Sequence, residues 1–189
     1  MQHGAYGDRL AASFRLSEPP TLTSHTAGGA RMAATELARD EPGYGFTAPI
    51  AAELAYLVGL QLRAVQQHEL WLDGRAVAVK PITPGTTHFY DLERNPVAYL
   101  PEPFHPLFFY MPRAALAEQA EELGDPGIDD LRHTPGEFLA DSVVHQFGLC
   151  LLPALHARNE VHQLFVDHVL LADFRAGSCR HRRRSRCRR

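Results

Sequence analysis

The sequence lacks the features of a secreted or membrane-spanning protein. It has only three cysteines among 189 residues, and an odd number does not suit a disulfide framework. Cys150 lies in an apolar pattern typical of a helix core, while Cys179 and Cys187 lie in a basic tail. No apolar run approaches the roughly 20 residues that cross a bilayer, and the N-terminus lacks the charged-then-apolar layout of a signal peptide. We therefore expect a cytoplasmic protein that makes no membrane contact.

The sequence also lacks the short motifs of several enzyme classes. It contains no Gly-x-Ser-x-Gly elbow for a nucleophilic serine and no glycine-rich loop that would cradle a phosphate. No cysteine has a positioned histidine and asparagine. We expect no catalytic residues, no bound metal and no cofactor, and we do not expect an enzyme.

Basic residues are scarce everywhere except at the C-terminal end. Residues 1–174 hold all 22 acidic residues and 11 of the 19 basic ones, while residues 175–189 hold the other eight, all arginine. A body of that charge binds nucleic acid poorly, because phosphate neutralisation by Lys and Arg supplies most of the nonspecific affinity.

The N-terminal part has no sustained apolar period. Residues 1–35 are rich in Gly, Pro, Ser and Thr, which predicts a mobile arm. A short helical pattern (MAATELAR) follows over residues 32–39. The folded body is expected to begin soon afterwards.

Short apolar or alternating runs separated by turn residues fill residues 54–111 and predict antiparallel strands. Asp73-Gly74 stands between two such runs and predicts a hairpin, because a type I′ turn needs positive φ at both central positions. Prolines punctuate the later runs and favour sheet edges or strand ends there.

The remainder of the body predicts helices. Residues 112–124 begin with a proline and end at a glycine, and the apolar periods of 141–157 and 159–173 follow Asp141 and Asn159 as N-caps. The last two would form a C-terminal helical hairpin. Strands first and helices afterwards is the order of an α+β fold.

Aromatic and polar residues of the predicted strands form a candidate ligand pocket. Sites for small molecules are mainly apolar and aromatic with a few polar groups, and the residues that we select on this basis are Trp71, Glu69, His88, Tyr90 and Phe109. The same aromatic residues equally suit ordinary core filling.

Eleven histidines leave a metal site open as an alternative. His68, His88 and His105 with Glu69 would be the ligands of a small cupin-type metalloenzyme, and the stretch around Pro84, Gly85, His88 and Asn95 is similar to the second cupin motif. The His-x-His of the first cupin motif is missing from the strands, so neutral, structural histidines are the competing interpretation.

Residues 36–173 resemble the N-terminal sensing and dimerisation region of AraC-type transcription regulators, most specifically at 68–75, 108–116 and 164–172. The resemblance implies a cupin-like antiparallel β-barrel that binds a small-molecule effector, followed by helices through which two copies pair. The predicted pairing residues lie on the helical hairpin and are Val144, Phe147, Leu151, Val161, Leu164, Phe165 and His168.

In that family two helix-turn-helix units follow, and the present sequence has no counterpart to them. We expect a domain over residues 36–174 that lacks sequence-specific DNA binding, is not a competent activator, and forms a homodimer or pairs with an intact regulator. Residues 175–189 predict a disordered tail, interpreted as the product of a shifted reading frame. A stand-alone ligand-binding module with a native basic tether remains the alternative.

Overall fold

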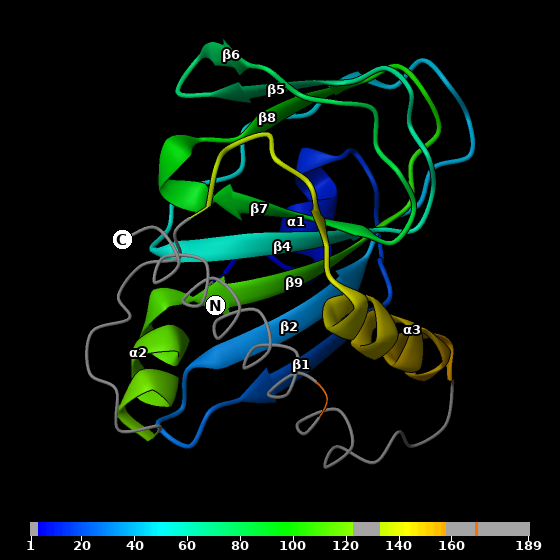
Figure 1. The fold of residues 1–189 in the computed structure, drawn as a ribbon. Coiled ribbons are helices and arrows are strands. Elements are labelled where there is room, and N and C mark those ends of the chain that lie inside the picture. Colours follow the sequence, from blue (N-terminus) through cyan, green and yellow to red (C-terminus); the bar gives the residue numbers. More distant parts are fainter. Residues whose placement is uncertain (1–3, 123–132, 158–168, 170–189) are drawn as a thin grey trace.

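The computed structural model describes residues 4–122, 133–157 and 169 of the chain (Figure 1). Strands dominate this part, with three α-helices and one short 3-10 helix. The elements in chain order are α1 (Gly7–Ser13), β1 (Thr21–His25), β2 (Arg31–Glu36), β3 (Gly45–Phe46), β4 (Ala55–Gln61), β5 (Glu69–Leu72), β6 (Arg75–Val77), β7 (Thr86–Asp91), η1 (Leu92–Arg94), β8 (Val97–Leu100), β9 (Pro106–Pro112), α2 (Arg113–Glu122), β10 (Leu139–Ala140) and α3 (Ser142–His156).

The strands form two antiparallel sheets. The larger has the order β1-β2-β9-β4-β7-β10 and the smaller has the order β3-β8-β5-β6. Figure 1 shows the smaller sheet above the larger one. No ladder joins the two sheets within the described residues, so the expected closed barrel is instead an open arrangement of two facing sheets.

Both faces of the larger sheet are buried. Along β9, Phe108 and Tyr110 belong to the core between the sheets, whereas Leu107, Phe109 and Met111 belong to a second core on the other face. Successive side chains of a strand point to opposite faces, so a strand covered on both sides reads as a continuous apolar run. This burial explains the run PLFFYM at residues 106–111.

Helices α2 and α3 cover the outer face of the larger sheet (Figure 1). Both were expected from the sequence, and Asp141 caps α3 as predicted, because its carboxylate accepts the N–H groups of Val143 and Val144. Gly148 allows α3 to approach the sheet, since a Cβ at this position would collide with the side chain of Leu60. The second helix of the expected hairpin, 159–173, lies outside the described residues except for the buried Val169.

The N-terminal segment is a part of the fold, so the prediction of an arm without regular structure over residues 1–35 was wrong for residues 4–35. Helix α1 places Leu10 and Ala11 in the core between the sheets, and β2 pairs with the central strand β9. Residues 32–36, predicted as helix from their alanines, are all buried in β2. Packing on both faces overrides local helix propensity there.

The Asp73-Gly74 turn is confirmed. It joins β5 to β6, and φ is 52° at Asp73 and 72° at Gly74, as a type I′ turn requires.

Within the described residues, every helix is too short or too polar to span a bilayer.

Candidate ligand site between the sheets

A cavity of about 60 Å³ lies between the two sheets. Its wall is mostly apolar and comes from both sheets, from the loops that join them and from the residue after α1. The lining residues are Phe14, Thr47, Ile50, Leu57, Gln61, His68, Glu69, Leu70, Ile82, His88, Tyr90, Pro96, Val97, Ala98, Leu100, Phe104, Pro106 and Phe108.

Three phenylalanines from distant parts of the chain form one end of this wall. The ring of Phe14 lies 5.9 Å from that of Phe104 and 5.8 Å from that of Phe108. These centroid distances fall within the range of favourable aromatic contacts. The N-terminal segment therefore completes the cavity, a role that sequence analysis missed.

His88 and Tyr90 supply a polar pair to the wall. They lie two residues apart on β7 and point to the same face, with the Tyr90 hydroxyl 3.0 Å from Nδ1 of His88. Burial, followed by the nearby His68, lowers the pKa of His88 to about 3. Burial also raises the pKa of Tyr90 well above its usual value. At neutral pH the pair is thus an uncharged imidazole and an intact phenol.

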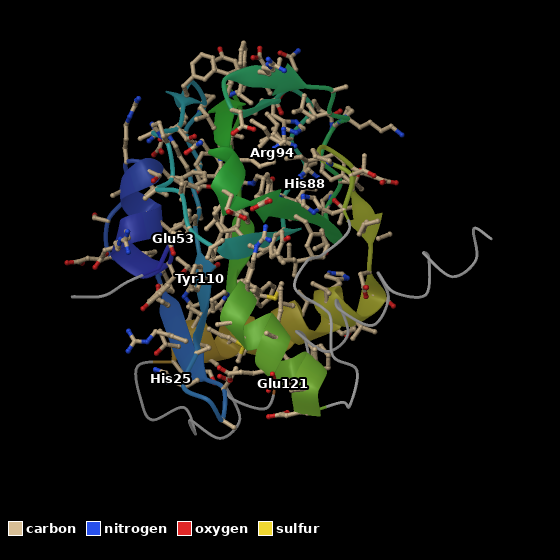
Figure 2. All side chains as sticks on the ribbon, turned by 90° about the vertical axis from the view of Figure 1, so that its left-hand side faces the viewer. His25, Glu53, His88, Arg94, Tyr110 and Glu121 are labelled. Atoms are coloured by element: carbon tan, nitrogen blue, oxygen red, sulfur yellow. The ribbon has the colours of Figure 1, made fainter. Side chains whose placement is uncertain are left out.

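The other nitrogen of His88 has no hydrogen-bond partner. The side chain is 2% exposed, and Nε2 is buried without an acceptor or donor among the residues that the structure describes. Another polar pair of the interior is formed by Tyr110 and Glu53, where the Tyr110 hydroxyl donates to Glu53 at 2.8 Å. Figure 2 shows that pair well apart from His88.

A second imidazole lies beside His88. The rings of His68 and His88 are 6.5 Å apart. Burial lowers the pKa of His68, partly offset by the charge of Glu102. Both histidines of the wall therefore favour the neutral form.

The segment before α3 covers the histidine end of the cavity. Phe138 packs against both imidazole rings, and β10 pairs with Thr86 and Thr87 of β7. Gly136 lies against the backbone of Ala78, just after β6, where no Cβ would fit. The segment from 133 to 140 thereby bridges the open edges of the two sheets and runs across the front of β7 in Figure 1.

A second, wider depression of about 260 Å³ adjoins the cavity. It shares His68 and Glu69 with the cavity wall and also includes Lys80, Gln66 and Tyr99. The two spaces are therefore neighbours, with His68 and Glu69 between them.

Of the five residues predicted to line a pocket, His88, Tyr90 and Glu69 lie in the cavity wall. Trp71 does not, because along β5 the inward positions are Leu70 and Leu72. The Trp71 indole instead donates to the Glu69 carboxylate at 2.9 Å and packs against Phe46.

Phe109 is also absent from the cavity wall and belongs to the core under the helices. Its neighbour Phe108 occupies the wall in its place. Phe108 and Phe109 are adjacent aromatic residues, and only the register of β9 decides which ring faces inward.

The alternative metal ligands do not converge. His105 points to the Glu36 carboxylate, with Nε2 and Oε1 2.6 Å apart, instead of toward His68 and His88. Among the described residues no cluster of three His, Cys, Asp or Glu side chains could hold a metal ion. The four residues named for the metalloenzyme alternative therefore do not form one ligand set in this arrangement.

The predicted pairing residues divide into two groups. Val144 and Leu151 are buried against the larger sheet within the chain, and Phe147 packs beside them, so Val144 and Leu151 cannot be contact residues for a partner in this arrangement. Leu149, on the outward face of α3, is 41% exposed. The other four predicted residues, Val161, Leu164, Phe165 and His168, lie outside the described residues.

No family model matches the chain, and no curated protein matches it. Among solved structures, the cupin domain of Schizosaccharomyces pombe Cnp3 is similar with a TM-score of 0.34 and 6% identity. The match covers 58% of this chain and 74% of that domain.

Proposed function

We propose that this chain is the effector-sensing and dimerisation part of an AraC-type transcription regulator with a cupin-like fold. The observation that carries the proposal is the cavity between the sheets, which combines a mostly apolar and aromatic wall with a buried, unpartnered nitrogen of His88. Small-molecule sites have this composition, with a mainly apolar wall and few polar groups.

The sequence resemblance supports the same function. Two of its most specific pieces are residues 68–75, which contain β5 and the turn that leads into β6, and residues 108–116, which lead from β9 into α2. The first piece carries His68 and Glu69, and the second carries Phe108. Each of these two pieces thus contributes residues to the cavity wall, while the third, residues 164–172, lies outside the described residues except for Val169.

The proposed partners are a small-molecule effector and a second protein chain, either another copy or an intact regulator. Within the proposal the chain acts in the cytoplasm, catalyses no reaction and reads no DNA sequence, because sequence readout needs side chains that reach base edges. The exposed Leu149 on α3 is the described surface residue that best fits a pairing contact.

A screen of small molecules against the full chain, read by thermal denaturation, tests the sensing function. A ligand should raise the denaturation midpoint, because it stabilises the folded chain by RT ln(1 + L/Kd), where L is the free ligand concentration. A Phe108→Trp variant, which fills the cavity, should lose the response, while Phe46→Trp, outside the cavity, should keep it. Protection of a specific promoter sequence by this chain alone, or stoichiometric metal with substrate turnover, would contradict the proposal.

A further inference from the structure

Three polar residues of the cavity wall, Thr47, Tyr90 and His88, differ in the hydrogen bonds that they make. The Thr47 hydroxyl is engaged, since it accepts the backbone N–H of Ala98 at 3.0 Å. The Tyr90 hydroxyl has one partner among the described residues, Nδ1 of His88. Nε2 of His88 has none.

The Tyr90 proton fixes the tautomer of His88. A buried hydroxyl that does not donate loses a hydrogen bond that it had in water, at a cost of about 1–3 kcal/mol. Nδ1 is the acceptor within reach, so we infer that the hydroxyl donates to it and that the ring proton resides on Nε2. The other tautomer would leave both the hydroxyl proton and Nε2 without a partner among the described residues. His88 therefore presents a buried N–H that lacks an acceptor.

The charges of the wall exclude one class of ligand. Among the described residues that line the cavity there is no lysine or arginine. Glu69 also borders the cavity, but its exposed carboxylate accepts the Trp71 indole N–H on the outward side of β5. Both histidines favour the neutral form because burial lowers their pKa values. A carboxylate or phosphate placed here would lose its hydration without gaining a cation in exchange.

We propose that the cavity binds a neutral, mainly apolar molecule whose single hydrogen-bond acceptor, such as a ketone, ester or amide oxygen, takes the Nε2–H of His88, and that it rejects carboxylates of the same size. This inference rests on the proposed sensing function and names the chemical class of its effector.

The volume of the cavity sets the size of the buried portion. About 60 Å³ is several times the minimum of roughly 10–15 Å³ that a cavity needs to hold one water molecule, so a small carbonyl-bearing group fits. Further atoms of a larger ligand would reach the adjoining depression between His68 and Glu69.

The first test measures the tautomer directly in the full chain. Two-bond ¹H–¹⁵N correlation of the histidine rings distinguishes the two neutral tautomers by their nitrogen shifts. We expect the Nε2–H form for His88 at neutral pH, and the Nδ1–H form for a fraction of molecules once Tyr90→Phe removes the donor. A predominant Nδ1–H form, or a charged ring at neutral pH, in the unsubstituted protein would overturn the inference.

The second test compares three probes of similar size: methyl propyl ketone, butyrate and pentane. The ketone should bind and shift the His88 Nε2 resonance, pentane should bind more weakly without that shift, and butyrate should bind least. His88→Phe should weaken ketone binding by roughly threefold to tenfold and leave pentane binding unchanged. Trp71→Phe, outside the cavity, is the matched control.

The outcomes separate this inference from the proposed function. Equal or tighter binding of butyrate, or ketone binding that His88→Phe does not weaken, would refute the neutral-acceptor class and leave a sensing role intact. Failure of all three probes to bind would count against the sensing function itself and would remove the inference with it.

Discussion

The Glu36 carboxylate, at the end of β2, lies 2.6 Å from Nε2 of His105, the residue before β9. Its other oxygen is 2.7 Å from Nε2 of His156 at the end of α3, in a direction that does not make a hydrogen bond. Only 7% of the Glu36 side chain is exposed. One buried carboxylate therefore connects two strands and a helix.

Glu36→Gln should lower the free energy of unfolding by about 1.5–3 kcal/mol, because hydrogen bonds to charged groups contribute roughly that much. Urea denaturation at neutral pH measures the change. Glu41→Gln, at an exposed position, is the control and should stay within about 0.5 kcal/mol of the unsubstituted protein. Equal stability of the two variants would contradict the role given to Glu36.

His88 should make the stability depend on pH. Its pKa is lowered to about 3 in the folded chain, so between the usual pKa near 6.5 and pH 3 only the unfolded chain binds the proton. Stability is thus fully present above pH 6.5 and falls as the pH decreases, by up to about 1.4 kcal/mol per pH unit. Denaturation at pH 7.5, 6.5, 5.5 and 4.5 should show a shallower decline in His88→Phe. Parallel curves would show that His88 does not titrate as stated.

Phe108→Ala and Phe109→Ala should separate cavity effects from core effects. Each removes a buried ring, so each should cost about 3–5 kcal/mol of stability. Only Phe108→Ala enlarges the cavity, because only Phe108 lines it. NMR titration should therefore detect binding of probes larger than methyl propyl ketone to Phe108→Ala and not to Phe109→Ala. The reverse pattern would contradict a β9 register that places Phe108 at the cavity and Phe109 in the core under the helices.

Gly148→Ala should destabilise the protein although alanine favours helices by about 1 kcal/mol. The added Cβ collides with Leu60 of β4, and overpacking of this kind costs roughly 1–3 kcal/mol. Guanidinium denaturation measures the result. Gln146→Ala, at an exposed position of α3, should be neutral, and Leu60→Ala in the same chain as Gly148→Ala should relieve the collision.

Leu149→Glu tests the pairing surface. The side chain is 41% exposed on the outward face of α3, so a charge there should leave stability within about 0.5 kcal/mol but should disrupt a dimer that uses this face. Light scattering with size-exclusion chromatography reports the mass of the particle. A dimer of unchanged affinity would show that the pairing contact does not use the outward face of α3 around Leu149.

Sequence reasoning succeeded where the signal is local. The Asp73-Gly74 turn, the Asp141 cap and the apolar period of α3 each depend on residues a few positions apart. It failed for β2, because the alanines of residues 33 and 34 favour a helix in isolation, whereas the strand gains burial on both faces from β9 and its neighbours.

The candidate site was only partly predictable for a similar reason. His88 and Tyr90 follow from alternation along one strand, but the choice between Phe108 and Phe109 depends on register, which a doubly buried strand does not reveal. Phe14 and Phe138 come from outside the predicted strands, and long-range packing alone brings them to the cavity. No pattern in their own segments indicates it.

The larger sheet forms a partition one backbone thick. On β9, adjacent side chains lean in opposite directions: Phe108 touches the cavity, and Phe109 touches the layer that carries α2 and α3. Any displacement of that backbone moves both rings together. A change in the cavity wall that displaces the β9 backbone would therefore also change the packing of α2 and α3 on the outer face of the sheet.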